Sequence, residues 1–158
     1  MSNSTFIPKV GFFGIEEALD KNGAYASVTE GVSMRPLFKT HRDVVILQKP
    51  EGRLSKYDVA LYKRGEKYVL HRVIGFDNKN GVYLIRGDNT FRIERIPKDS
   101  VIARLVSFNR KGKHTDVTDK GYLFYARVWN FIYPLRFVLH MLRRALGKIK
   151  RAFFPKKQ

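Results

Sequence analysis

The stretch between residues 43 and 110 most constrains the fold, because five runs rich in β-branched and aromatic residues follow one another there. Short turn signals separate them, among them Pro50-Glu51-Gly52 and Asn78-Lys79-Asn80-Gly81. Runs of this length between turn residues are typical of strands joined by short connections. The pattern predicts a mainly β fold: a compact, mostly antiparallel domain that ends near Lys113. The five expected strands are Asp43–Lys49, Asp58–Arg64, Lys67–Phe76, Val82–Arg86 and Val101–Arg110.

A short helix is expected before the strands. From Gly14 to Lys21 the acids come first and the lysine last, which complements the helix dipole, and Asn22-Gly23 supplies a stop. The first twenty residues lack a basic segment followed by a long apolar core, so we expect neither a secretory signal nor a membrane anchor there.

The charge composition changes at Gly121, because every charged side chain beyond it is basic. This predicts a folded domain over residues 1–120 and a basic tail over residues 121–158. Within the tail, apolar residues recur at helical spacing and basic residues fill the other positions, which predicts a basic amphipathic helix. The apolar positions are Leu135, Val138, Leu139, Leu142, Leu146, Ile149 and Phe153.

Composition excludes some kinds of site and favours one kind of partner. The 158 residues include no cysteine, so disulfides and thiolate metal sites are excluded, and the four histidines show no metal spacing. We therefore expect no metal and no cofactor. The net charge of +17 favours a phosphate-bearing partner, either nucleic acid or anionic lipid. Nucleic acid is the less favoured partner, because no reader motif is present.

Three short segments carry reactive groups where plain core or turn residues are expected: Gly31–Pro36 (GVSMRP), Leu70–Val73 (LHRV) and Gly87–Asn89 (GDN). Each has an ordinary interpretation when taken alone. Ser33 would be a loop serine, His71 a hydrogen-bonded core histidine and Gly87–Asn89 a turn.

Together, in this order, the segments resemble the signal peptidase and repressor-autoprotease superfamily of serine peptidases. The resemblance covers roughly residues 27 to 105 and implies the antiparallel β peptidase fold of that superfamily. Some members use lysine as the base. His71-Arg72-Val73 resembles instead the histidine branch, which includes the archaeal and endoplasmic-reticulum signal peptidases.

The resemblance implies roles for individual residues. Ser33 would be the nucleophile, with its backbone N–H as an oxyanion donor, and His71 the general base. Glu94 stands where an aspartate completing a triad is expected; either Glu94 or Asp88 could orient His71, and we favour Glu94, with Asp88 holding the turn. Relatives often carry an oxyanion hydroxyl at the place of Gly31, so a second donor must come from elsewhere.

The implied substrate is an extended peptide that adds as a strand to a sheet edge, with small side chains entering pockets near Met34 and Pro36. The function expected from this resemblance is a serine endopeptidase that cleaves a precursor, signal or leader peptide after small residues. Two alternatives stay open: a peptide-binding module without catalysis, and a self-cleaving protein of the repressor kind.

The tail suggests where the protein works. No window of about 20 residues is free of charge at its centre, so we expect residues 121–158 to lie on an anionic membrane, at its cytoplasmic face, without crossing it. Tyr125, Trp129, Tyr133 and Phe137 are expected in the headgroup region. The alternative is that residues 122–133 pack on the domain.

Overall fold

The computed structural model describes residues 14–65 and 67–153, with side chains to residue 147, and its main element is an antiparallel sheet. The described elements are α1 (Ile15–Asn22), β1 (Ala24–Val28), β2 (Val44–Gln48), β3 (Val59–Arg64), β4 (Lys67–Asp77), β5 (Val82–Arg86), β6 (Glu94–Pro97), the 3-10 helix η1 (Lys98–Ser100), β7 (Val101–Arg110), β8 (Lys113–Asp116), α2 (Lys120–Phe131) and α3 (Tyr133–Phe153). The mainly β, antiparallel class and the short N-terminal helix are confirmed.

The sheet follows the order β1-β2-β7-β3-β4-β5-β6, with β8 paired to β7. Its two long strands change partners along their length. The first half of β4 pairs with β3 and the second half with β5, while β7 pairs with β2, β3 and β8. Among the described strands, Lys67–His71 pair with β3, and β1 forms one end of the sheet.

All five predicted strands are present, as β2, β3, β4, β5 and β7. The strands that the sequence did not indicate are β1, β6 and β8. They have only four or five residues each; half of β6 (ERIP) and all of β8 (KHTD) are polar. Such segments become strands because a neighbouring strand supplies hydrogen-bond partners, which is a tertiary effect that local pattern does not record.

The core consists of two clusters of buried residues. One cluster contains Leu54, Ala60, Tyr62, Val73, Tyr83 and Ile85. The other combines strand residues such as Val45 and Leu105 with Leu19 of α1 and with Met34, Leu37 and Phe38 from the loop between β1 and β2. The loop that carries Ser33 is therefore part of a hydrophobic core.

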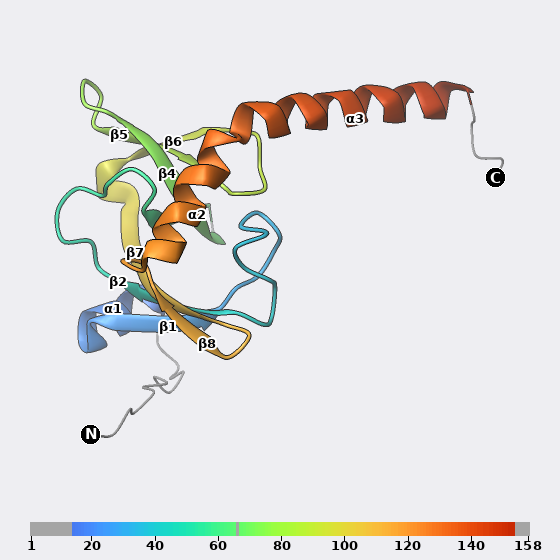
Figure 1. Cartoon of the computed structure of the whole chain (residues 1–158). Helices are drawn as coiled ribbons and strands as arrows, with labels where there is room; N and C mark the ends of the chain where they lie inside the picture. Colours follow the sequence, from blue (N-terminus) through green and yellow to red (C-terminus); the bar gives the residue numbers. More distant parts are fainter. Residues whose placement is uncertain (1–13, 66, 154–158) are drawn as a thin grey trace.

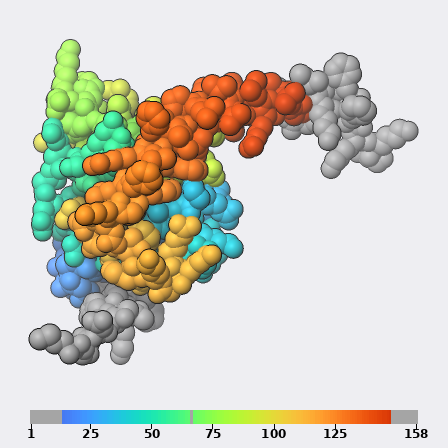
Figure 2. Space-filling model, viewed as in Figure 1, coloured from blue at the N-terminus to red at the C-terminus, as the bar shows by residue number. Residues whose placement is uncertain are grey.

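Helix α2 lies across the sheet, and α3 extends away from it (Figure 1). The space-filling view shows α2 against the body and the distal part of α3 standing clear of it (Figure 2). Tyr122 and Ala126 of α2 are buried, and Tyr122 belongs to the core. The alternative in which residues 122–133 pack on the domain thus describes the structure. The boundary at residue 120 stays a prediction based on composition.

The tail contains two helices that meet at Ile132. Pro134 has no backbone N–H and disfavours the helical conformation of the residue before it, so a break here is expected, and the second helical position of α3 tolerates it. Of the expected apolar positions, Ile149 and Phe153 have side chains outside the described part. Within the described residues, none of the helices combines the length and apolar character needed to span a bilayer.

Candidate active site

Ser33 lies in a tight turn between β1 and β2, and contacts of the residues that follow it hold this turn in place. Phe38 and Met34 pack into the core, and the fully buried Asp43 accepts hydrogen bonds from the Lys39 N–H (2.8 Å) and the Arg42 guanidinium. These hydrogen bonds lower the pKa of Asp43, the contact with Arg42 being the largest cause, so the carboxylate stays ionised. The nucleophile candidate therefore sits on a rigid support.

Gly31 stands two residues before Ser33 with φ +77°. A residue with a Cβ is strained in this left-handed region, so a side-chain hydroxyl at this position would be costly. The backbone conformation gives a physical reason for the glycine.

His71 lies on β4 opposite Ala60 and is 4% exposed. Its Nδ1 is 3.3 Å from Oε1 of Glu94 and 3.1 Å from the hydroxyl of Tyr62. The other carboxylate oxygen of Glu94 accepts a hydrogen bond of 3.1 Å from Arg64. Glu94 thus bridges the imidazole and a guanidinium, as an orienting acid would.

Burial lowers the pKa of His71; the negative charge of Glu94 opposes this, and the positive charge of Arg64 adds to it. The imidazole is therefore neutral near pH 7. Glu94 beside Nδ1 favours the tautomer that carries the proton on Nδ1 and leaves Nε2 as an acceptor. This is the state that a general base needs.

Gly87 is the point at which the three sequence segments meet. A Cβ on Gly87 would lie 2.7 Å from the Ser33 carbonyl oxygen and 3.0 Å from His71 Nε2. Asn89, two residues after Gly87, donates a hydrogen bond of 2.7 Å from its backbone N–H to the same Ser33 carbonyl. Its side-chain amide donates a second hydrogen bond, of 3.2 Å, to the Val32 carbonyl. Ser33 and the free nitrogen of His71 are thus neighbours across a glycine.

The Ser33 hydroxyl donates to no other group in the described part of the chain. Hydrogen bonds between nucleophile and base are often long before substrate binds and shorten in the complex. The geometry brings Ser33, His71 and Glu94 into one cluster, in the order nucleophile, imidazole, carboxylate.

Asp88 forms a buried ion pair with Arg72. Its two carboxylate oxygens accept hydrogen bonds from Arg72 at 2.7 and 2.8 Å, and the two side chains are 0% and 2% exposed. Tyr125 donates to the same carboxylate at 3.0 Å. The backbone carbonyl of Asp88 accepts hydrogen bonds from Trp129 (2.9 Å) and Arg136 (2.6 Å). Asp88 therefore joins α2 and α3 to the turn next to Ser33.

These contacts correct one expectation about the tail. Tyr125, Trp129 and Tyr133 do not present their polar ends to a headgroup region, because each donates to Asp88 or, for Tyr133, to the Phe91 carbonyl. Phe137 packs its ring near that of Phe91. Tyr125, Trp129 and Tyr133 therefore lie on the side of the helices that faces the domain, while Phe137 is 39% exposed.

A cleft of about 810 Å³ opens in front of the cluster. Ser33, His71 and Glu94 line it, together with Met34 as a buried side chain. Two strands contribute to its walls: Tyr25, Ser27 and Val28 come from β1, and Lys67, Tyr68, Val69 and Leu70 come from β4. Pro36 is exposed and is not among the lining residues, so the structure does not place it at the binding site expected for it.

Two residues near His71 were not singled out from the sequence. Tyr62 and Arg64 are two apart on β3, so their side chains share a face, and both contact Glu94. Alternation along the strand could have placed them together, but the pairing of β3 with β4 and the position of Glu94 were needed to direct them at His71.

Comparison with known families found no family model that matches this chain, and no curated protein matches its sequence. Within residues 14–65 and 67–153, no group of three histidine, aspartate or glutamate side chains could hold a metal ion. The function must therefore be argued from the site itself.

Proposed function

We propose that the protein is a serine endopeptidase of the signal-peptidase type, with Ser33 as nucleophile, His71 as general base and Glu94 as the acid that orients it. The observation that carries the proposal is the meeting at Gly87, where the nucleophile turn and the free imidazole nitrogen approach the same point. Glu94 on the other ring nitrogen and the cleft in front support the same assignment.

The proposed reaction is acyl transfer. His71 Nε2 takes the proton of the Ser33 hydroxyl while Oγ attacks the substrate carbonyl carbon, giving a tetrahedral oxyanion. Collapse breaks the peptide C–N bond, and the imidazolium gives its proton to the leaving amine. Water, deprotonated by the same nitrogen, then attacks the acyl-enzyme and releases Ser33 with its proton restored. Glu94 stabilises the imidazolium in both halves.

The Ser33 N–H is a suitable oxyanion donor, because it makes no hydrogen bond to another described residue. Substrate would bind as an added strand. Among the described strands, β1 lies at one end of the sheet and lines the cleft, so an extended peptide could pair with its backbone. The preference for small residues at the cut remains part of the proposal.

Incubation with a library of extended peptides, read by mass spectrometry, tests the function. The wild type is expected to cut, Ser33→Ala to bind without cutting, and Ser100→Ala, which alters an exposed serine outside the cleft, to cut as the wild type does. Binding without cleavage by the wild type would favour the non-catalytic module. Truncation of the chain itself during incubation would favour the self-cleaving alternative.

Replacement of Arg64 should change the pH dependence of cleavage. The positive charge of Arg64 lowers the pKa of His71, so Arg64→Gln is expected to raise it and to move the acid limb of kcat/KM to higher pH. In the wild type this limb is expected below the ordinary histidine value of 6.5. Lys63→Gln, which removes the neighbouring charge on the other face of β3, should leave the profile unchanged. An acid limb that stays in place in Arg64→Gln would contradict the role given to Arg64.

Peripheral attachment at the cytoplasmic face is the location we propose. A leader or precursor peptide made in the same compartment would then reach the cleft directly. Protease protection in sealed cells tests the face, and a domain digested from outside would contradict this location.

A further inference from the structure

An apolar stripe runs without interruption along α2 and α3. Its members recur every three or four residues, and their exposed fractions lie between 38% and 84%. The stripe consists of Phe124, Val128, Phe131, Leu135, Val138, Leu142 and Leu146. From the sequence, only the apolar positions on α3 were predicted. Residues 122–133 were left out because they could also have packed on the domain. Both helices contribute to one surface.

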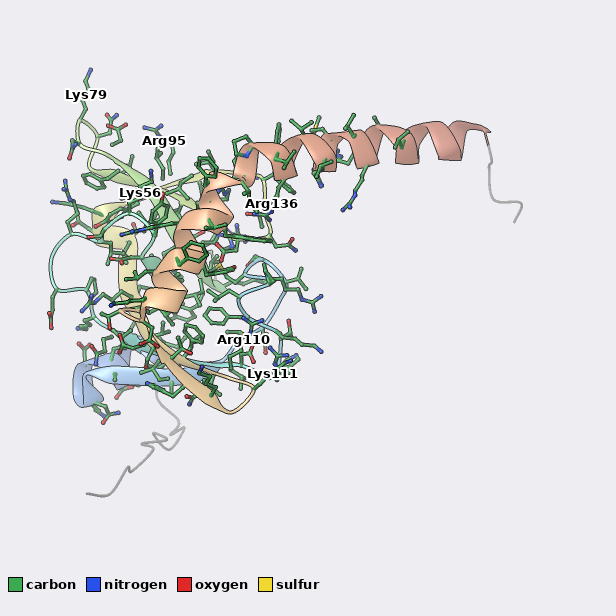
Figure 3. The ribbon with its side chains drawn as sticks, in the orientation of Figure 1. Lys56, Lys79, Arg95, Arg110, Lys111 and Arg136 are labelled. Atoms are coloured by element: carbon green, nitrogen blue, oxygen red, sulfur yellow. The ribbon has the colours of Figure 1, made fainter. Side chains whose placement is uncertain are left out.

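The opposite side of the same helices is packed on the domain. On α2, Tyr122 and Ala126 are buried, and on the first two turns of α3, Arg136 contacts the Asp88 carbonyl and His140 stacks on Phe91 at 4.2 Å between ring centroids. Helical periodicity therefore directs the apolar stripe away from the domain. Figure 3 shows Arg136 close to the junction of α2 and α3.

Two kinds of partner fit a stripe with this spacing: the same stripe of a second copy, as in a coiled coil, or a bilayer surface. Charge decides between them. Every charged residue beyond Gly121 is basic, including Arg127, Arg143 and Arg144 in the exposed parts of the helices. Two such stripes would bring like charges together, whereas anionic headgroups would be attracted.

Basic residues of the sheet domain extend this charge beyond the helices. Lys79 lies toward one end of the molecule, and Arg110 and Lys111 lie toward the other (Figure 3). Together with the net charge of +17, this distribution suits a broad anionic surface better than a single small ligand.

We propose that the apolar stripe is a docking surface for an anionic lipid bilayer, and that α2 and α3 lie along the bilayer surface together. The packed helix α2 is part of the contact, so the domain binds in a fixed orientation and is not tethered by a loose tail. Because α2 also contacts the Asp88 turn, this orientation extends to the cleft. The proposal stands independently of the peptidase assignment.

Vesicle sedimentation with the full chain tests the docking surface. The wild type is expected to bind vesicles of phosphatidylcholine mixed with phosphatidylglycerol, to bind pure phosphatidylcholine much more weakly, and to be released by high salt. Phe131→Gln on α2 should lower the partition coefficient about tenfold, because a large apolar side chain no longer enters the interface. Phe124→Gln should act in the same direction.

Met141→Gln is the matched control, since Met141 is 48% exposed on α3 but lies off the stripe. It should bind as the wild type does. Far-ultraviolet circular dichroism of each variant verifies the helices. Unchanged binding of Phe124→Gln and Phe131→Gln would overturn the proposal and leave at most a tail contact. Equal binding to both kinds of vesicle would remove the role of charge. A dimer in solution that the stripe variants disrupt would assign the stripe to a second copy.

Discussion

Gly87→Ala is expected to lower peptide cleavage by about 100-fold or more while the protein remains folded. The added Cβ would lie 2.7 Å from the Ser33 carbonyl oxygen and 3.0 and 3.1 Å from the His71 ring. Contacts under 3.0 Å cannot persist, so the turn, the nucleophile loop or the imidazole must shift. The Ser33 carbonyl belongs to the backbone and accepts a hydrogen bond from the Asn89 N–H. It therefore cannot move without moving the turn as well. Any of these shifts separates the nucleophile from its base.

Gly75→Ala is the control for this substitution. Its Cβ would approach nothing closer than the flexible end of Leu84 at 3.4 Å, which is ordinary contact. Cleavage close to the wild-type rate is expected, measured as kcat/KM on the same peptide. Wild-type activity in Gly87→Ala would show that the close approach at Gly87 has no part in catalysis.

Asp88→Asn is expected to destabilise the protein by about 3–5 kcal/mol, because it leaves the buried Arg72 guanidinium without its counter-charge. Arg72 would then have only neutral acceptors: the Tyr57 carbonyl, the Tyr122 hydroxyl and the one amide oxygen that remains at position 88. The loss would appear as a lower midpoint in urea or guanidinium unfolding, with the contacts between α2 and the Asp88 turn weakened.

Two other substitutions serve as comparisons for Asp88→Asn. Asp77→Asn changes a carboxylate whose partner Arg95 is largely exposed, and stability close to that of the wild type is expected. Glu94→Gln should reduce cleavage strongly with a much smaller loss of stability, since Glu94 orients His71 and Asp88 holds the turn. If Asp88→Asn lost activity at full stability, the roles of the two acids would have to be exchanged.

The strands with β-branched, aromatic runs were predictable because periodicity and turn residues are local signals. The short strands were not, since β6 and β8 depend on the neighbours that pair with them. The pairing of β4 first with β3 and then with β5 also could not be predicted from local pattern, yet it determines where His71 lies in the sheet. Topology therefore had to come from the structure.

The reactive residues of the candidate site were predictable from the sequence. The residues that hold them in place were less so. The segments around Ser33, His71 and Asn89 indicated a nucleophile, a base and a turn, and the structure brings them together at Gly87. Tyr62 and Arg64 were missed because a tyrosine and an arginine on a strand carry no signal of their own. The aromatic face of α2 was misplaced, because helical periodicity shows that two faces differ without showing which one meets the protein.

The central claim is that Ser33 and His71 act as one catalytic unit, and their combined substitution tests it most directly. On a peptide that the wild type cleaves, kcat would be compared for Ser33→Ala, His71→Ala and the double variant, with Ser100→Ala as control. Residues that act together give losses far from additive, so each single variant should lose nearly as much as the double one. Additive losses, or substantial cleavage by Ser33→Ala, would contradict the account.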